Sequence, residues 1–371
     1  MMSARFLTVV LERAFNMRDG FGREIDYMRI SVIDSCNLNC YYCNPCDNNE
    51  HCHALNILSV KEVLCIVRAA TRLGIKHFRL TGGEPLLHPQ LDEMVLQIKK
   101  IPGVSSVSFT TNAVLLAQHA KWLKEAGIDS INVSLDTIDA SEYKRITKKP
   151  LLEEVKHGIN AAIECGIRVK INVVLTPQTD VVALTRYVAK KGTDIRFIEM
   201  MPVGEGHTNG VEPYKKVIGT LSKLYGEPCR INTEKTKEIN SGNDKRKIPD
   251  NGPAEYYIFP ELGIRVGLIQ AIHGKFCDTC NRIRVTADGR LMPCLGSSVT
   301  MDLVPDSWDF ADDVEKDFAI VRALRAAIKA KPRCHNFNDN AVTYTKTTET
   351  KTTEIEAAEV NAARNMSRIG G

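Results

Sequence analysis

Short β-branched and apolar runs alternate with longer amphipathic segments between residues 28 and 199. The short runs predict six strands, over Met28–Ile33, Lys76–Leu80, Ser105–Thr110, Ser130–Leu135, Arg168–Val174 and Ile195–Glu199. Apolar positions at helical spacing predict helices over 59–73, 91–99, 114–126, 152–165 and 181–190. This alternation favours a parallel sheet with crossover helices. An open doubly wound sheet and a barrel built from six of the usual eight units both have this order.

Polar and glycine-rich clusters follow the predicted strands, and their positions favour the barrel. In chain order they are Cys36–Cys43, Gly82–Pro85, Thr110–Asn112, Ser134 with Asp136, Asn172, and Glu199–Gly204. Functional groups at the carboxyl ends of many strands are typical of βα-barrel enzymes. A dinucleotide fold would carry G-x-G-x-x-G after one strand, and no such motif occurs there. We therefore expect an α/β fold, a partial (β/α)6 barrel of TIM type.

A smaller region follows the predicted barrel. The charged stretch Glu234–Lys247 predicts a surface loop, and Tyr256–Phe259 and Ile264–Leu268 predict two further strands. Thr343–Thr353, rich in Thr, Lys and Glu, predicts a solvent-exposed segment. We expect residues 1–230 to form the core barrel and residues 231–371 to form the C-terminal region.

Composition narrows the class of protein. The 371 residues are 43% hydrophobic and 25% charged, which is typical of a soluble globular chain. No apolar run approaches the roughly 18 residues that span a bilayer. The apolar stretch 6–11 ends at Glu12, too early for a secretory signal, so we expect a cytoplasmic protein without membrane contact. A net charge of +4 does not predict nucleic-acid binding, but it suits a small polyanion.

The chain holds 12 cysteines, which in a reducing compartment indicate metal or redox chemistry rather than disulfides. Three of them, Cys36, Cys40 and Cys43, supply three thiolates on one loop. Three thiolates leave one iron of a four-iron cluster open, so the motif fits a cluster that binds a ligand. The alternative is a zinc site completed by His51 or His53.

A second group of three cysteines lies far downstream, at Cys277, Cys280 and Cys294. Asp288-Gly289 predicts a two-residue hairpin turn between them. Counting back from that turn pairs Cys294 with Ile283, which brings the three thiols together and again leaves one metal position open. Arg282 and Arg284 alternate along the same strand and therefore share a face, as a cationic pair beside the thiols. A solvated strand face is the alternative interpretation of this pair.

Several motifs together indicate a family. Cys36-Asn-Leu-Asn-Cys40-Tyr-Tyr-Cys43, followed by Thr81-Gly-Gly-Glu-Pro85, resembles the radical S-adenosylmethionine (SAM) superfamily. Phe276–Cys294 is similar to the C-terminal signature of the GTP 3′,8-cyclase family within it, which opens molybdenum cofactor (molybdopterin) biosynthesis. Segments 28–34, 195–204 and 331–335 and the closing Gly370-Gly371 also fit, so the resemblance extends nearly end to end.

The resemblance implies two [4Fe–4S] clusters and SAM as cofactors, and GTP as substrate. The first cluster would rest on Cys36, Cys40 and Cys43, and the second on Cys277, Cys280 and Cys294. SAM contacts would come from Tyr42, Gly83, Ser134 and Met201. GTP contacts would come from Arg29, Arg79, Thr110, Lys170, Arg282 and Arg284. The catalytic residues would be Arg282, Arg284, Gly370 and Gly371, because the family's double-glycine tail enters the active site. A buried arginine–carboxylate pair is the alternative for Arg29 or Arg79, and a frayed end for the tail.

The family's reaction defines the expected partners. A 5′-deoxyadenosyl radical made from SAM abstracts hydrogen from ribose C3′ of GTP. The resulting carbon radical attacks guanine C8 and gives 3′,8-cyclo-7,8-dihydroguanosine triphosphate. The resemblance therefore implies a reductant protein and a downstream cyclic pyranopterin monophosphate synthase, and it leaves a homodimer open.

Two rival functions and two departures from the family pattern stand beside this hypothesis. The rivals are a radical SAM peptide maturase with an auxiliary cluster and a non-catalytic zinc-binding module. One departure is the segment after the first triad, whose Cys46, Cys52, His51 and His53 could bind another metal. The other is Ala113, which follows Thr-Thr-Asn where the family more often has glycine. Both affect the expected substrate geometry rather than the reaction class.

Overall fold

The computed structural model describes residues 17–43, 56–203, 210–231, 252–297, 299–303, 313–335 and 337. All six predicted strands are present, each bound within two residues of its prediction. They are β1 (Tyr27–Ser31), β2 (His77–Thr81), β3 (Ser106–Thr111), β4 (Ser130–Ser134), β5 (Val169–Val174) and β6 (Asp194–Ile198). Neighbours in the sequence pair in parallel, in the order of the chain. The partial barrel is thereby confirmed.

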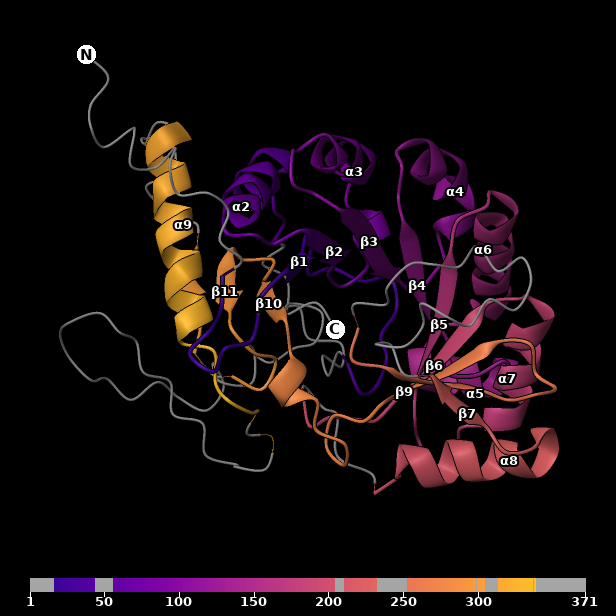
Figure 1. Ribbon diagram of the computed structural model, residues 1–371. Helices are drawn as coiled ribbons and strands as arrows, with labels where there is room; N and C mark the ends of the chain where they lie inside the picture. Colours follow the sequence, from indigo (N-terminus) through magenta and orange to yellow (C-terminus); the bar gives the residue numbers. More distant parts are fainter. Residues whose placement is uncertain are drawn as a thin grey trace, which may run out of the picture.

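The predicted crossover helices are also present, and they cover the outer face of the curved sheet (Figure 1). They are α2 (Val60–Arg72), α3 (Leu91–Lys99), α4 (Leu116–Glu125), α6 (Leu152–Glu164) and α7 (Val181–Lys190). At the start of α2, Ser59 and Glu62 form the expected capping box. Among the described helices, none combines the length and the apolar content that a membrane span needs.

The C-terminal region extends both edges of the barrel sheet. Beside β6, β9 (Arg265–Ile269) pairs in parallel, followed by the antiparallel strands β8 (Glu255–Ile258) and β7 (Cys229–Ile231). Beside β1, β10 (Arg282–Val285) pairs in parallel, followed by β11 (Arg290–Met292) and β12 (Met301–Asp302). The described sheet of twelve strands therefore stays open, with β7 and β12 as its two edge strands. The boundary after residue 230 remains a prediction, although strands from both sides of it share this sheet.

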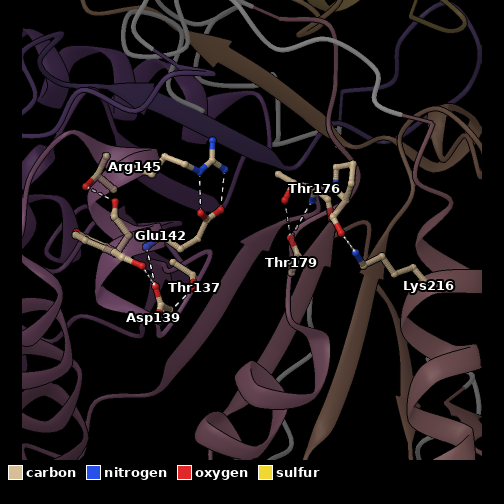
Figure 2. Close-up of polar contacts among 11 residues, drawn as sticks. Thr137, Asp139, Glu142, Arg145, Thr176, Thr179 and Lys216 are labelled. Carbon is tan, nitrogen blue, oxygen red and sulfur yellow. Dashed lines mark hydrogen bonds and ion pairs between the residues drawn. The ribbon is translucent and has the colours of Figure 1, made fainter.

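Three further helical elements lie around this extension. Helix α9 (Asp313–Lys329) packs against α2, where Arg72 and Asp317 form an ion pair of 2.7 Å. Helix α8 (Gly219–Tyr225) follows a π-helical turn, η3 (Tyr214–Ile218). Lys216 of this turn donates to the carbonyl of Thr176, just after β5, at 3.0 Å (Figure 2). The contact fixes this π-helical turn to the carboxyl end of β5.

Strict alternation along the barrel strands separates an apolar face from a polar face. Met28, Ile30, Phe78 and Leu80 are fully buried in the core that lies between sheet and helices. The alternate positions point to the concave side, and many of them are polar: Arg29, Arg79, Thr110, Asn132, Lys170 and Arg196. Buried parallel strands are usually apolar on both faces. The polar concave face therefore indicates that it contacts a ligand rather than a core.

Helix α5 (Ala140–Thr147) was not predicted from the periodicity, and neither were α8 and α9. The Asp139 side chain accepts the Glu142 N–H at 2.8 Å and caps its first turn. Its end is set by Lys148, whose φ of 61° is in the left-handed region. A helix of two turns contains too few apolar positions for a clear periodic signal. Only Asp139, a residue type that favours helix N-caps, marks the start of this helix in the sequence.

The expected hairpin is present, but its predicted register is wrong by one residue. Arg284 pairs with Met292, and Val285 pairs with Leu291. The turn is a longer loop, in which Thr286 N–H donates to the carbonyl of Arg290 and Gly289 has a φ of 75°. Continuing this register places position 294 opposite 282, rather than opposite Ile283. The thiol of Cys294 is therefore aligned with the strand position of Arg282.

Replacing Lys148 by glycine should stabilise the fold. An exposed non-glycine residue in the left-handed region costs about 1 kcal/mol, and glycine removes that cost at a helix end. We expect Lys148→Gly to raise the free energy of unfolding by about 1 kcal/mol in urea denaturation. The control Lys144→Gly, inside α5, should lower it by a similar amount. A destabilised Lys148→Gly variant would show that the backbone carries no strain there.

Candidate active site

The first cysteine triad lies on the loop that follows β1. Burial raises the pKa of Cys36 to about 11, and burial with the charge of Cys36 raises that of Cys43 to about 12. Burial and the charges of Cys43, Asp136 and Cys36 also raise the pKa of Cys40. The three thiols therefore converge closely enough to repel one another when ionised. Because metal ligation needs thiolates, such a site is suited to a strongly positive group.

A single metal ion and a cluster require different spacings of the thiols. Zinc–sulfur bonds of about 2.3 Å would hold four thiolates about 4 Å apart. Within the described part of the chain, no three Cys, His, Asp or Glu side chains are grouped for one metal ion. A four-iron cluster is larger and keeps its ligands further apart. Cys46, Cys52, His51 and His53, which could complete a separate site, lie outside the described residues.

The glycine-rich turn after β2 packs directly on the approach to Cys36. A Cβ atom on Gly82 would lie 2.2 Å from the Ile33 carbonyl oxygen, and one on Gly83 would lie 2.1 Å from that of Ser35. Gly83 N–H donates to Ile33 and Glu84 N–H to Ser35, both at 2.8 Å. Only glycine permits this close approach of two backbones. The turn therefore fixes the backbone of residues 33–35, which lead into the thiol loop.

Glu84 connects this turn to the end of β3. Its buried carboxylate accepts the Thr111 hydroxyl and the Asn112 N–H, both at 2.7 Å. Burial raises the pKa of Glu84 to about 7. Asn112 in turn donates to Cys36 Sγ at 3.8 Å. The next residue, Ala113, has a φ of 64°, a left-handed backbone conformation that glycine adopts more easily than alanine.

The expected SAM residue Tyr42 is held by a carboxylate that carried no assigned role in the sequence. Its hydroxyl donates to Asp136 at 2.6 Å, and Asp136 also accepts the Val174 N–H at 2.8 Å. Burial raises the pKa of Asp136 to about 6. Tyr42, Asp136, Cys40 and the strand end at Ser134 all line one cleft. The signal that could have found Asp136 is its place in the polar pair that ends β4.

The fourth expected SAM residue, Met201, lies on the other side of the barrel mouth. It follows β6 and packs against Val203 and Met292, which belong to the region of the second triad. It is therefore not brought into the cleft of Tyr42 and Ser134 by the described contacts.

The expected GTP residues form rows across the concave face. Arg284, Arg29 and Arg79 are in register on β10, β1 and β2. Burial and the charges of Arg284, Arg79 and Arg282 lower the pKa of Arg29. Burial and Arg282 lower the pKa of Arg284 to about 10. The guanidinium groups of Arg29, Arg79, Arg282 and Arg284 are therefore close enough to influence one another electrostatically.

The second row supplies hydrogen-bonding groups. Thr110, Asn132 and Lys170 are in register on β3, β4 and β5. Among the described residues, Thr110 Oγ1 and both amide atoms of Asn132 are buried without a hydrogen-bond partner, as is Arg196 Nη2. Buried polar atoms without partners are rare in folded proteins, and they indicate a missing ligand or water. Asn132 and Arg196 were not assigned from the sequence, and only their register reveals them.

The second triad gathers beside β10. Cys277 begins η4 (Cys277–Thr279), Cys280 precedes β10, and Cys294 follows β11. Burial and the charges of Cys294 and Cys280 raise the pKa of Cys277. Although burial opposes it, Arg282 and Lys331 lower the pKa of Cys280 to about 7. The triad therefore has one thiol that ionises easily and is ready to ligate a metal.

Two buried cations clamp the loops that carry this triad. Arg23, paired with Asp19, donates to the carbonyls of Cys277 (2.6 Å), Pro332 (2.6 Å) and Arg333 (2.9 Å). Lys331 donates to the carbonyls of Arg282 (2.8 Å) and Pro293 (2.9 Å). Glu199 at the end of β6 accepts the Ile272 N–H at 2.7 Å and pairs with His273. Arg23, Asp19 and the role of Glu199 were not predicted.

Comparison with known proteins finds family models that match both the barrel and the region that follows it. The Radical SAM superfamily model matches residues 30–183, and the Molybdenum Cofactor Synthesis C model matches residues 193–337. The crystal structure of Streptococcus suis SuiB has a TM-score of 0.55 at 14% identity, over 76% of this chain and 65% of that chain. SuiB bound to S-adenosylmethionine has a TM-score of 0.51 at 16% identity, over 81% and 68%. At these identities the likeness shows the fold alone.

Curated relatives are much closer in sequence. The GTP 3′,8-cyclase of Clostridium perfringens (strain SM101 / Type A) is 35% identical over 324 residues, which cover 86% of this chain and 95% of that protein. The GTP 3′,8-cyclase of Petrotoga mobilis is 35% identical over 331 residues, which cover 87% and 96%. The barrel and its first thiol loop define a radical SAM enzyme, whose cofactors are SAM and iron–sulfur clusters. The chain belongs to the GTP 3′,8-cyclase family, which uses two such clusters.

Proposed function

We propose that this chain converts GTP to 3′,8-cyclo-7,8-dihydroguanosine triphosphate, the first step of molybdenum cofactor biosynthesis. The observation that carries the proposal is the cationic concave face, where Arg29, Arg79, Arg282 and Arg284 meet between two cysteine triads. Four guanidinium groups gathered on one face suit a polyanion, and arginine matches phosphate oxygens through its planar fork. A triphosphate supplies that charge. The relatives named GTP 3′,8-cyclase support the same substrate.

The residues divide into two sets of proposed ligands. Cys36, Cys40 and Cys43 would hold the first cluster, with Tyr42, Gly83, Ser134 and Met201 around SAM. Cys277, Cys280 and Cys294 would hold the second, with Arg29, Arg79, Thr110, Lys170, Arg282 and Arg284 around GTP. When bound, the clusters and SAM supply a 5′-deoxyadenosyl radical and an open iron for the substrate.

The contribution of the chain itself is orientation and charge. The arginine row would fix the triphosphate and so place the ribose of GTP towards the cleft beside Tyr42. The buried sheet and the thiol loops would exclude water from that space. The tail residues Gly370 and Gly371, proposed to complete the site, lie outside the described residues. The reductant protein, the downstream synthase, a homodimer and a cytoplasmic location also stay predictions.

The rival functions are less well supported. A peptide maturase shares the fold, since SuiB has been solved bound to a precursor peptide, but SuiB is only 14–16% identical to this chain. A zinc module without turnover is contradicted by the family to which the chain belongs.

Turnover under anaerobic conditions tests the proposal. The reconstituted chain is incubated with SAM, dithionite and GTP, and parallel reactions contain ATP or no nucleotide. We expect GTP to be consumed together with 5′-deoxyadenosine formation and a cyclised product of unchanged mass. ATP should give at most uncoupled 5′-deoxyadenosine. SAM cleavage without any dependence on GTP would refute the substrate while leaving the enzyme class intact.

A further inference from the structure

Helix α5 lies directly against the first thiol loop. The carbonyl of Thr147 accepts the Asn39 N–H at 3.0 Å, and that of Ile146 accepts the Tyr41 N–H at 3.1 Å. These two bonds flank Cys40 in the sequence. The last turn of α5 is therefore the surface element that adjoins the ligand loop of the first cluster.

This last turn carries a concentrated positive charge. We call the group formed by Tyr41, Lys144, Arg145, Lys148 and Lys149 the α5 basic patch. Its four cations are all exposed, and the Tyr41 side chain is 36% exposed. The guanidinium group of Arg145 lies 5.6 Å from the centre of the Tyr41 ring, so the patch reaches from the helix onto the loop itself.

Most of this charge is not neutralised. Glu142 holds Arg145 with two hydrogen bonds of 2.7 Å, and Asp139 is used as the helix cap (Figure 2). Of the nearest acids on α6, Glu153 pairs with Lys156. In the described residues no ion pair joins Lys144, Lys148 or Lys149 to a carboxylate.

The position of this charge distinguishes it from an ordinary solvated face. The whole chain has a net charge of only +4, and Lys170, Arg196 and Arg284 are buried on the concave face. That face is assigned to SAM and GTP, so an electron for the first cluster must arrive from another side. The α5 basic patch is on the outside of the same loop and carries an exposed aromatic ring.

We propose that the α5 basic patch is the docking surface for an acidic one-electron carrier protein, a reduced flavoprotein or iron–sulfur protein. The carrier gives up one electron, the cluster on Cys36, Cys40 and Cys43 accepts it, and no bond or proton changes hands in that step. Opposite charges on two proteins speed such encounters. Their attraction weakens in salt, which screens charges that are more than about 10 Å apart. The inference rests on the proposed function, because only a redox-active cluster requires a carrier.

The test compares two double charge reversals in the full, cluster-loaded chain. Lys144→Glu/Lys149→Glu changes the patch, and Lys148 is left in place because of its left-handed backbone. Lys100→Glu/Lys121→Glu is the matched control, since both lysines are exposed on the outer helices. The probe is a flavodoxin, whose oxidised form is titrated against each protein at low ionic strength. The reduced form, and separately dithionite, then drives 5′-deoxyadenosine formation.

We expect the patch variant to bind flavodoxin roughly tenfold to a hundredfold more weakly, with a reduced salt dependence. Its flavodoxin-driven rate should fall in parallel, whereas its iron content and dithionite-driven rate should match the unmodified chain. The control should bind and react normally. Lys144→Gln/Lys149→Gln should show a smaller loss of the same kind, which separates lost attraction from added repulsion.

The outcomes distinguish the docking surface from the function. Flavodoxin affinity equal to that of the unmodified chain in both patch variants would overturn the docking surface. An equal loss in the control would overturn it too, because net charge alone would then explain binding. An unmodified chain that fails to cleave SAM with dithionite would refute the proposed function itself, and the docking proposal would fall with it.

Discussion

Replacing Cys40 by alanine should abolish SAM cleavage. Cys40 is the central thiol of the first loop, and its neighbours Asn39 and Tyr41 are fixed to α5, so no other described thiol can move into its place. A cluster that lacks one protein ligand loses the geometry that leaves one iron open for SAM. We expect no 5′-deoxyadenosine above background under dithionite. The control Cys165→Ala, at the end of α6, should retain the full rate.

The second triad should give a different result. Cys294→Ala should spare the first cluster, so that some uncoupled SAM cleavage persists, while bound iron falls by about half. GTP binding should be lost, because Cys294 is aligned with Arg282 at the substrate face. Wild-type 5′-deoxyadenosine formation in Cys40→Ala would remove Cys40 from the ligand set. Unchanged iron and GTP affinity in Cys294→Ala would make the second triad structural.

Replacing Arg284 by methionine should stabilise the ligand-free protein and weaken GTP binding. Burial and Arg282 lower the pKa of Arg284 to about 10, so its charged form is disfavoured in the folded state. Arginine remains charged at neutral pH, and the difference from the ordinary pKa corresponds to about 3 kcal/mol. Methionine keeps much of the side-chain volume without the charge. We expect a higher free energy of unfolding in denaturant for the variant.

The same variant should bind GTP at least about tenfold more weakly. A hydrogen bond between charged groups contributes about 1.5–3 kcal/mol, which corresponds to that factor or more. SAM affinity should stay within about twofold, because no described contact joins Arg284 to the Tyr42 cleft. The control is Arg72→Met, an arginine half-exposed on α2, which should change neither affinity. Equal losses of SAM and GTP affinity, with lower stability, would show that the fold was damaged.

The barrel and its ligand loops could be predicted because their signals are local. Alternation of apolar and polar residues sets each strand, and helix caps such as Ser59 with Glu62 set the crossovers. In the parallel barrel, such short-range patterns also fix which face of each strand is buried. The cysteine spacing around Cys40 and the glycine pair at Gly82 are short-range as well. Through their resemblance to a known family, these two motifs indicate the cofactors, SAM and an iron–sulfur cluster, before the fold is known.

Other features depend on residues that are distant in the sequence. No pattern near Arg23 indicates that it donates to the carbonyls of Cys277 and Pro332, because the partners lie more than 250 residues away. The hairpin register failed for a related reason: the Asp-Gly pair allows both a two-residue turn and the longer loop that is observed.

The sequence by itself determined the chemical groups of this protein, namely two thiol triads and a set of cations suited to a triphosphate. It also determined the partial barrel that carries them. The tertiary structure alone decided how these parts meet. It places Arg284 beside Arg29 by joining β10 to β1, it anchors Tyr42 on Asp136, and it sets a cationic helix end against Cys40. The physical reason is that hydrophobic periodicity and turn preferences act over a few residues. Charge repulsion, strand order and unsatisfied polar groups arise only when the folded chain brings distant segments together.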